Sequence, residues 1–182
     1  MKAFIGAASL SLALLLAGCG EGGDNASNVA VPENNAPLPQ VQAPNGDWTQ
    51  VVTQTPDGGF VMGNPNAPVK LVEYASFTCP HCKTFSQEAT DELTNEYVKS
   101  GQVSWEFRNF VFNPIDLAAT MLARCQGTGA FFGLAEQLFT NQQSWAGSFN
   151  EISDAEAQRI QALPREQQVA ALAKAGGLDQ FF

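Results

Sequence analysis

The residues best suited to chemistry are two cysteines two positions apart, in the motif Cys79-Pro80-His81-Cys82. Such a pair can be a dithiol or a disulfide and can exchange that state with a substrate. A strand-like run, residues 69–75, precedes the motif, and a helix-like run, residues 84–89, follows it. Because of this context, the motif is a candidate redox centre.

The position of Cys79 before a helix predicts which sulfur attacks. A thiolate attacks disulfides, and the unpaired N–H groups at a helix N-terminus favour negative charge. We expect Cys79 to have a lowered pKa and to attack, and the more buried Cys82 to resolve the mixed disulfide. Pro80 suits the first helical turn, where its missing N–H costs nothing. His81, the single histidine of the chain, can add a positive charge or a hydrogen bond beside the thiolate.

The charge and composition of the chain argue against some classes of partner and cofactor. The chain has 182 residues, is 45% hydrophobic and carries a net charge of -9. This length suggests one domain with additions, and the acidity argues against nucleic acid, which favours Lys and Arg. Zinc would need four ligands, and Lys83 stands where c-type haem attachment needs a histidine. We therefore expect no cofactor and no metal.

The N-terminus predicts export. Lys2 precedes an apolar run, residues 4–16, which is as long as a signal-peptide core and short for a membrane span. The run ends in Leu16-Ala17-Gly18-Cys19, which resembles the lipobox of bacterial lipoproteins, in which the cysteine is lipidated. We predict a lipoprotein signal peptide at 1–18 and lipidation of Cys19. An ordinary signal peptide with an incidental cysteine is the alternative.

A polar segment separates this N-terminus from the predicted domain. Residues 20–46 are rich in Gly, Asn, Ala and Pro and contain no Lys, Arg or aromatic residue. Such a composition buries too little apolar surface to offset the entropy of ordering. The interpretation is a flexible tether at 19–46.

The rest of the chain predicts strand, helix, strand and then a series of helices. The strand candidates are residues 48–53, 60–62, 69–75 and 103–111, with a turn at 56–59. The first helix carries apolar residues four apart, and two parallel strands joined by a helix form a βαβ unit. These apolar residues are Phe85, Ala89, Leu93 and Tyr97. Further helices are predicted at 116–125, at 131–139, from Ser153 and from Pro164, with Phe131, Leu134 and Leu138 as packing residues.

Residues 63–74, together with Ser76-Phe77-Thr78 and the cysteine motif, resemble the DsbA family of periplasmic thiol oxidases. The resemblance extends into the helices after Asp116. It implies an α/β fold, thioredoxin-like, with an inserted helical domain. The domain boundaries predicted on this basis are 47–114 for the N-terminal part of the thioredoxin-like domain and 115–182 for the helical insertion.

Glu73 matches a family glutamate that is buried near the second cysteine. The resemblance implies that Glu73 exchanges a proton with Cys82, and burial would raise its pKa. From the strand pattern alone, an exposed carboxylate is equally compatible with this position.

The chain departs from the family after Phe132. Family members close the active site with a Thr-Pro loop whose proline is cis, followed by strands and a final helix. The Thr-Pro of this chain, Thr55-Pro56, lies before the motif instead. The C-terminal strands and helix are therefore expected to be missing, either because the chain is truncated or because it is a natural short form.

Cys125 is the cysteine without an assigned role. In an apolar helix it is either a buried inert thiol or half of a structural disulfide with a cysteine beyond residue 182. The pattern leaves both interpretations open.

The predicted function is that of a lipid-anchored, periplasmic thiol–disulfide oxidoreductase. A stabilised thiolate makes the disulfide form a stronger oxidant, so the motif favours donating disulfides to exported proteins. A membrane redox partner would reset the pair. Gly20, rather than Asp, follows Cys19 and favours the outer membrane. The alternatives are a disulfide isomerase or reductase, and a non-catalytic lipoprotein with a vestigial domain.

Overall fold

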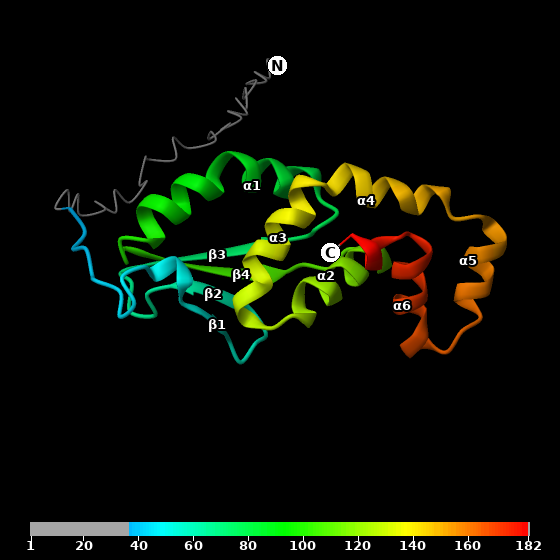
Figure 1. Ribbon diagram of the computed structural model, residues 1–182, viewed down its shortest axis with the longest axis horizontal. Helices are drawn as coiled ribbons and strands as arrows, with labels where there is room; N and C mark the ends of the chain where they lie inside the picture. Colours follow the sequence, from blue (N-terminus) through cyan, green and yellow to red (C-terminus); the bar gives the residue numbers. More distant parts are fainter. Residues whose placement is uncertain (1–36, 182) are drawn as a thin grey trace, which may run out of the picture. The chain divides into compact units, whose positions relative to one another are not determined.

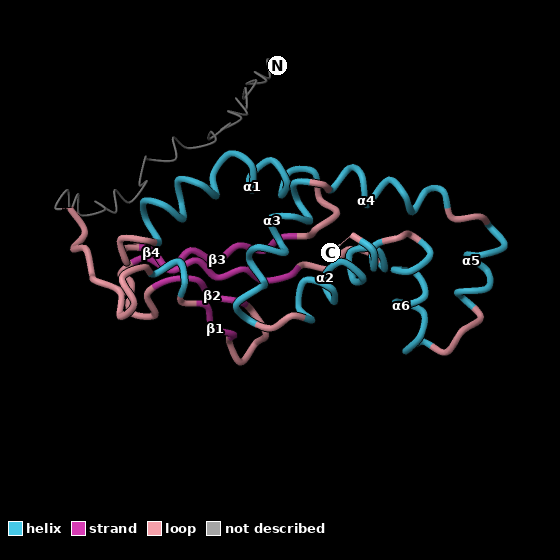
Figure 2. Tube along the Cα trace, in the orientation of Figure 1, coloured by secondary structure: helices cyan, strands magenta, loops and turns pink. Residues whose placement is uncertain are grey.

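A four-stranded mixed sheet forms the base of the computed structural model, which describes residues 37–181 (Figures 1 and 2). The parallel pairing of two strands confirms the predicted βαβ unit, because α1 (Pro80–Glu92) connects them. The other pairings are antiparallel. In spatial order the strands are β1 (Val52–Gln54), β2 (Phe60–Gly63), β4 (Val103–Asn109) and β3 (Val69–Ala75).

The helices that follow β4 include the four that were predicted. A short helix, α4, was not predicted, because its sequence has no clear apolar period. Asn113 and Ser153 accept hydrogen bonds from the backbone at the starts of α2 and α5, and Gly177 takes a φ of 69° after α6. The bounds are α2 (Pro114–Cys125), α3 (Phe131–Thr140), α4 (Gln142–Ser148), α5 (Asp154–Gln161) and α6 (Arg165–Ala175).

The segment before β1 differs from its prediction. Residues 48–50, expected in a strand, form the 3-10 helix η1 (Trp48–Gln50). The Asp47 carboxylate accepts the Thr49 N–H at 2.9 Å and the Thr49 hydroxyl at 2.8 Å, which stabilises a helical start. The strand therefore begins only at Val52.

The predicted signal peptide and Cys19 lie outside the described residues, as do tether residues 19–36. The tether residues that are described contact the folded body. Gln102 donates to the carbonyl of Leu38 at 2.9 Å, and the N–H of Val41 donates to the carbonyl of Ser100 at 3.0 Å. Within residues 37–181, no helix combines the length and apolarity that a membrane span requires.

The core lies between one face of the sheet and the helices. Alternate residues of each strand share a face, so Phe60 and Phe107, paired across β2 and β4, both face inward. Phe131 of α3 stacks on Phe60 with ring centroids 3.8 Å apart. Phe131 and Leu138 are fully buried and Leu134 is nearly so, which confirms their predicted packing role.

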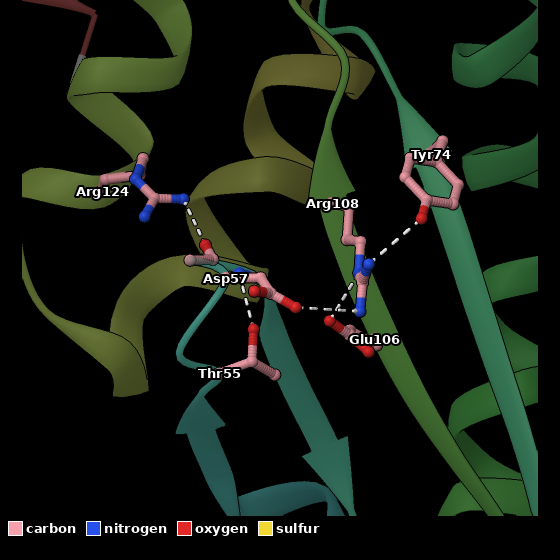
Figure 3. A network of polar contacts seen from close by, with 8 residues as sticks. Thr55, Asp57, Tyr74, Glu106, Arg108 and Arg124 are labelled. Atoms are coloured by element: carbon pink, nitrogen blue, oxygen red, sulfur yellow. Dashed lines mark hydrogen bonds and ion pairs between the residues drawn. The ribbon is translucent and has the colours of Figure 1, made fainter.

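The opposite face of the sheet carries a polar network (Figure 3). Arg108 of β4 donates to Glu106 at 2.7 Å and to the Tyr74 hydroxyl at 3.1 Å. Its guanidinium also lies 4.0 Å from Asp57 in the β1–β2 turn. The network fixes that turn against β4.

The predicted apolar face of the first helix is buried only in part: Leu93 packs against the core and Ala89 is half-buried. Phe85 and Tyr97 are exposed, and no residue of α1 itself is fully buried. The helix continues into a π-helical segment, η2 (Leu93–Val98), whose i→i+5 hydrogen bonds widen the turn and rotate the following side chains. As a result Val98, not Tyr97, enters the core.

The placement of the aromatic core predicts unequal effects for two Phe→Ala substitutions. Phe131→Ala should lower the free energy of unfolding by about 3–5 kcal/mol, because it removes a fully buried ring. Phe112→Ala, at a ring that is 64% exposed, should change it by less than about 1 kcal/mol. Urea unfolding of both variants measures the difference, and equal losses would contradict this core.

Candidate active site

The cysteine motif sits where β3 passes into α1. Cys79 is the N-cap of α1, with extended backbone angles, and Pro80 occupies the first turn as predicted. The N–H of Cys79 donates to the carbonyl of Ser76 at 3.1 Å, and the carbonyl of Cys79 accepts from Lys83 at 3.1 Å. These bonds close the turn and start the helix, so the Cys79 sulfur lies at its positive end.

The surroundings of Cys79 favour its thiolate. Burial raises the pKa of Cys79, but three hydrogen bonds together bring it below the ordinary 9.0. They come from the backbone N–H and the thiol of Cys82 and from the backbone N–H of His81. The negative charge of Asp116 opposes them in part. The lowered pKa predicted for Cys79 is thus present, with its source mainly in the backbone.

The surroundings of Cys82 favour its neutral thiol. Burial, followed by the nearby Cys79 and Glu73, raises the pKa of Cys82 to about 11, against a hydrogen bond from the Ser76 backbone that lowers it. Both cysteines are free thiols and half-buried, and Cys82 packs against the core. The two sulfurs of one motif are therefore shifted in opposite directions.

Glu73 faces the interior beside this pair. Strand alternation places Glu73 on the same face as its β4 partner Phe107. Burial raises the pKa of Glu73 from 4.5 to about 7, although the Trp105 indole N–H, which donates to its Oε2 at 2.9 Å, lowers it. The strand pattern left open whether the Glu73 carboxylate is buried or exposed, and the structure places it mostly in the interior.

A cavity of about 320 Å³ lies among α1, α3 and the inner face of the sheet. Glu73 and Trp105 are among the residues that line it, together with hydroxyl side chains of α1. The Thr90 hydroxyl oxygen is buried at this site and has no hydrogen-bond partner in the described structure. The Glu73 carboxyl therefore borders a polar space rather than a closed apolar core.

His81 was predicted to act on the thiolate through its imidazole. The imidazole is exposed and makes no hydrogen bond to any other described residue. The contribution of His81 to the thiolate comes from its backbone N–H instead.

Two side chains of the helical segment hold the turn before Cys79, and neither was predicted. Asp116 of α2 is fully buried and accepts the N–H of Phe77 and the N–H of Phe112, each at 3.0 Å. Gln142 of α4 donates to the carbonyls of Phe77 at 2.8 Å and of Cys79 at 2.9 Å. Because Asp116 and Gln142 lie 39 and 65 residues from Phe77 in the sequence, only the fold reveals these contacts.

Cys125 lies at the end of α2 and is exposed. The prediction of a buried inert thiol is therefore wrong: the last turn of α2 turns this side chain to the surface, where it donates to the carbonyl of Leu122 at 3.0 Å. Residues 37–181 contain no group of three His, Cys, Asp or Glu side chains that could hold a metal.

An apolar surface borders the active-site turn. Phe110 and Phe112, in the loop between β4 and α2, are more than half exposed. Asn113 ties this loop to the motif by donating to the Thr78 hydroxyl at 3.2 Å. The surface continues into a groove of about 740 Å³ between this loop, α5 and α6.

Comparison with known proteins identifies relatives of the same chemistry. The profile of the family described as Thioredoxin matches residues 55–179. A protein of Rickettsia conorii named "Putative protein-disulfide oxidoreductase" is 36% identical over 100 residues, or 54% of this chain and 36% of that protein. Disulfide bond formation protein D of Bacillus subtilis is 28% identical over 96 residues, 48% of this chain and 43% of that one. The chain thus spans less than half the length of these relatives.

A solved structure shares the fold as well. The crystal structure of a protein-disulfide isomerase from Novosphingobium aromaticivorans aligns with a TM-score of 0.62 at 32% identity. The alignment covers 68% of this chain and 63% of that one. The likeness shows an α/β thioredoxin-like fold with a helical insertion, as predicted.

The raised pKa of Glu73 predicts how stability depends on pH. Folded Glu73 stays protonated up to about pH 7, whereas the unfolded carboxyl ionises near 4.5, so stability falls as pH rises through this window. Glu73→Gln keeps an acceptor for Trp105 but cannot ionise. Its free energy of unfolding relative to wild type should therefore rise by about 3 kcal/mol between acid and neutral pH.

Urea unfolding of the reduced proteins at a series of pH values measures this difference. Glu88→Gln, at an exposed carboxylate of α1, serves as the control and should follow the wild-type curve. A constant difference between Glu73→Gln and wild type at every pH would show that Glu73 is not held neutral.

Proposed function

Since the chain belongs to the thioredoxin family, among its DsbA-like protein-disulfide oxidoreductases, we propose that it donates disulfides to exported proteins through Cys79 and Cys82. The observation that carries the proposal is the opposite shift of the two thiol pKa values. A sulfur that is stable as a thiolate is a good leaving group, so a disulfide that ends in Cys79 is readily transferred.

The reaction proceeds through two exchanges at Cys79. A client thiolate attacks the Cys79 sulfur of the Cys79–Cys82 disulfide, which joins client and Cys79 and releases Cys82 as a thiolate. A second client thiolate then attacks the client sulfur of this mixed disulfide and releases Cys79 as a thiolate. The client dithiol is oxidised to a disulfide, and the cysteine pair takes up the two electrons.

Glu73 is proposed to supply the proton that Cys82 needs. With a pKa of about 11, the departing Cys82 thiolate takes up a proton at neutral pH. The Glu73 carboxyl, whose pKa is about 7, is then a donor whose protonation changes near physiological pH. In the reverse direction the Glu73 carboxylate would accept the same proton when Cys82 attacks.

The apolar surface beside the motif is suited to binding a client protein that is still unfolded. Exported proteins reach a thiol oxidase before they fold, with apolar side chains exposed. Phe110 and Phe112 offer such chains an apolar contact beside the turn that carries Cys79. Burial of apolar area would hold the client while its thiolate reaches the sulfur.

The proposed location is the periplasmic side of a bacterial membrane, with lipidated Cys19 as the anchor. The support for it is the lipobox-like end of the N-terminal apolar run. There the reduced pair would return its two electrons to a membrane redox partner that carries a disulfide or a quinone-linked oxidant.

Isomerase activity is the second candidate, because the structure from Novosphingobium aromaticivorans is named a protein-disulfide isomerase. An isomerase needs the reduced pair to attack wrong disulfides, and the lowered pKa of Cys79 would favour the attacking thiolate. The two activities differ in which redox form of the protein acts.

The test compares serine variants in oxidation of a reduced model protein by the pre-oxidised chain. Cys79→Ser should reduce the rate to background, because no transferable disulfide forms. Cys82→Ser, loaded on Cys79 as a mixed disulfide with a client that has a single cysteine, should retain that client, because no second client thiolate is present to release it. Cys125→Ser, the matched control at an exposed thiol, should keep the wild-type rate.

A parallel assay with the reduced chain and a scrambled model protein separates the candidates. The proposal expects client oxidation to be the faster activity. Undiminished oxidation by Cys79→Ser would refute a role for the motif, and faster repair of scrambled disulfides would reassign the protein as an isomerase.

A further inference from the structure

Gln142 lies at the start of α4, beside the N-terminal end of α1 (Figure 1). Its side chain is buried, and its single amide nitrogen donates to two carbonyls, of Phe77 at 2.8 Å and of Cys79 at 2.9 Å. An amide NH₂ group has two protons, so both are used. The carbonyl oxygens of Phe77 and Cys79 are thereby held by the same nitrogen atom.

Asp116 holds the same turn from the other side. Its Oδ1 accepts the N–H of Phe77, whose carbonyl is bound by Gln142. Phe77 is fully buried, and its ring lies against Phe107 and Phe139 at centroid distances of 5.6 and 5.2 Å. The backbone of Phe77 is therefore fixed at its N–H, its carbonyl and its ring.

The carbonyl of Cys79 accepts two donors, the Gln142 amide at 2.9 Å and the Lys83 N–H at 3.1 Å. It belongs to the Cys79–Pro80 peptide group, and Pro80 has no N–H to donate. The first backbone donors of α1 available to the sulfur are those of His81 and Cys82, which lower the Cys79 pKa. Because the peptide group is planar, the orientation of the Cys79–Pro80 peptide determines how the backbone that follows it is oriented relative to the sulfur.

We propose that Gln142 is a positioning residue for Cys79: by binding the carbonyls of Phe77 and Cys79, it holds the turn so that the Cys79 side chain stays at the N-terminus of α1. The helical segment thereby sets the reactivity of a cysteine that lies on another part of the fold. The inference rests on the proposed function only in that Cys79 is the reacting sulfur.

A purely structural role for Gln142 makes a different prediction, and the chain contains a matched case. Gln168 of α6 also donates from its amide nitrogen to two carbonyls, of Gln161 at 3.1 Å and of Leu163 at 2.9 Å. These carbonyls close the α5–α6 connection and belong to no part of the motif. Replacing either glutamine removes a donor from two carbonyls, so each of the two substitutions should lower the stability of the fold.

The experiment measures Gln142→Met and Gln168→Met in the full chain, because methionine keeps the length of glutamine but donates nothing. The pKa of Cys79 is followed by the ultraviolet absorbance of its thiolate during a pH titration of the reduced protein. Gln142→Met should raise this pKa by about half a unit or more, while Gln168→Met should change it by less than about 0.2 unit. Urea unfolding should show a loss of stability in both variants.

The outcomes separate the two roles. A rise in the Cys79 pKa confined to the Gln142 variant supports positioning, and an unchanged pKa with lost stability overturns it. If Gln142→Met does not fold, Gln142→Leu takes its place with the same expectation. The titration needs no client, so an inactive wild-type chain would refute the proposed function and leave the positioning role of Gln142 to be decided by the pKa alone.

Discussion

The Cys79 sulfur lies at the N-terminus of α1, where the backbone of His81 and Cys82 lowers its pKa, and the rest of the site depends on this placement. Backbone donors are present whatever the side chains are, so the thiolate is stabilised without a neighbouring cation. The exposed His81 imidazole makes no hydrogen bond to the described residues, which agrees with a backbone origin. What the fold must supply is a fixed orientation of the turn that precedes the helix.

On the buried side of the motif, the surroundings favour protonated groups instead of a thiolate. Cys82 and Glu73 lie where burial opposes negative charge, so each favours its protonated form more than it would in water. In a cysteine pair, stabilisation of the reduced form makes the disulfide form a stronger oxidant, and the proposed function depends on this relation. The sheet contributes by placing Glu73 on its inner face, and Trp105 orients the carboxyl.

The features that depend on local sequence could be predicted. The strand-like run at residues 69–75 predicted β3, the cysteine spacing indicated the candidate site, and the apolar period of α3 placed Phe131 in the core. Predictions failed where a few residues change the geometry: the cap by Asp47 turned a predicted strand into η1, and the π-helical segment η2 rotated the buried face after α1. Long-range contacts could not be predicted at all. Gln142 stands in a polar run that resembles any surface segment, and it joins the site only because α4 packs against the turn that carries Cys79.

The reduction potential of the Cys79–Cys82 pair reports how far the fold stabilises the thiolate, and it is the decisive quantity for an oxidising pair. It is measured by equilibrating the full chain with mixtures of reduced and oxidised glutathione and quantifying the two redox forms. We expect a potential more oxidising than about -200 mV. A potential near thioredoxin's, about -270 mV, would contradict a stabilised Cys79 thiolate, because the pair would then hold its disulfide rather than donate it.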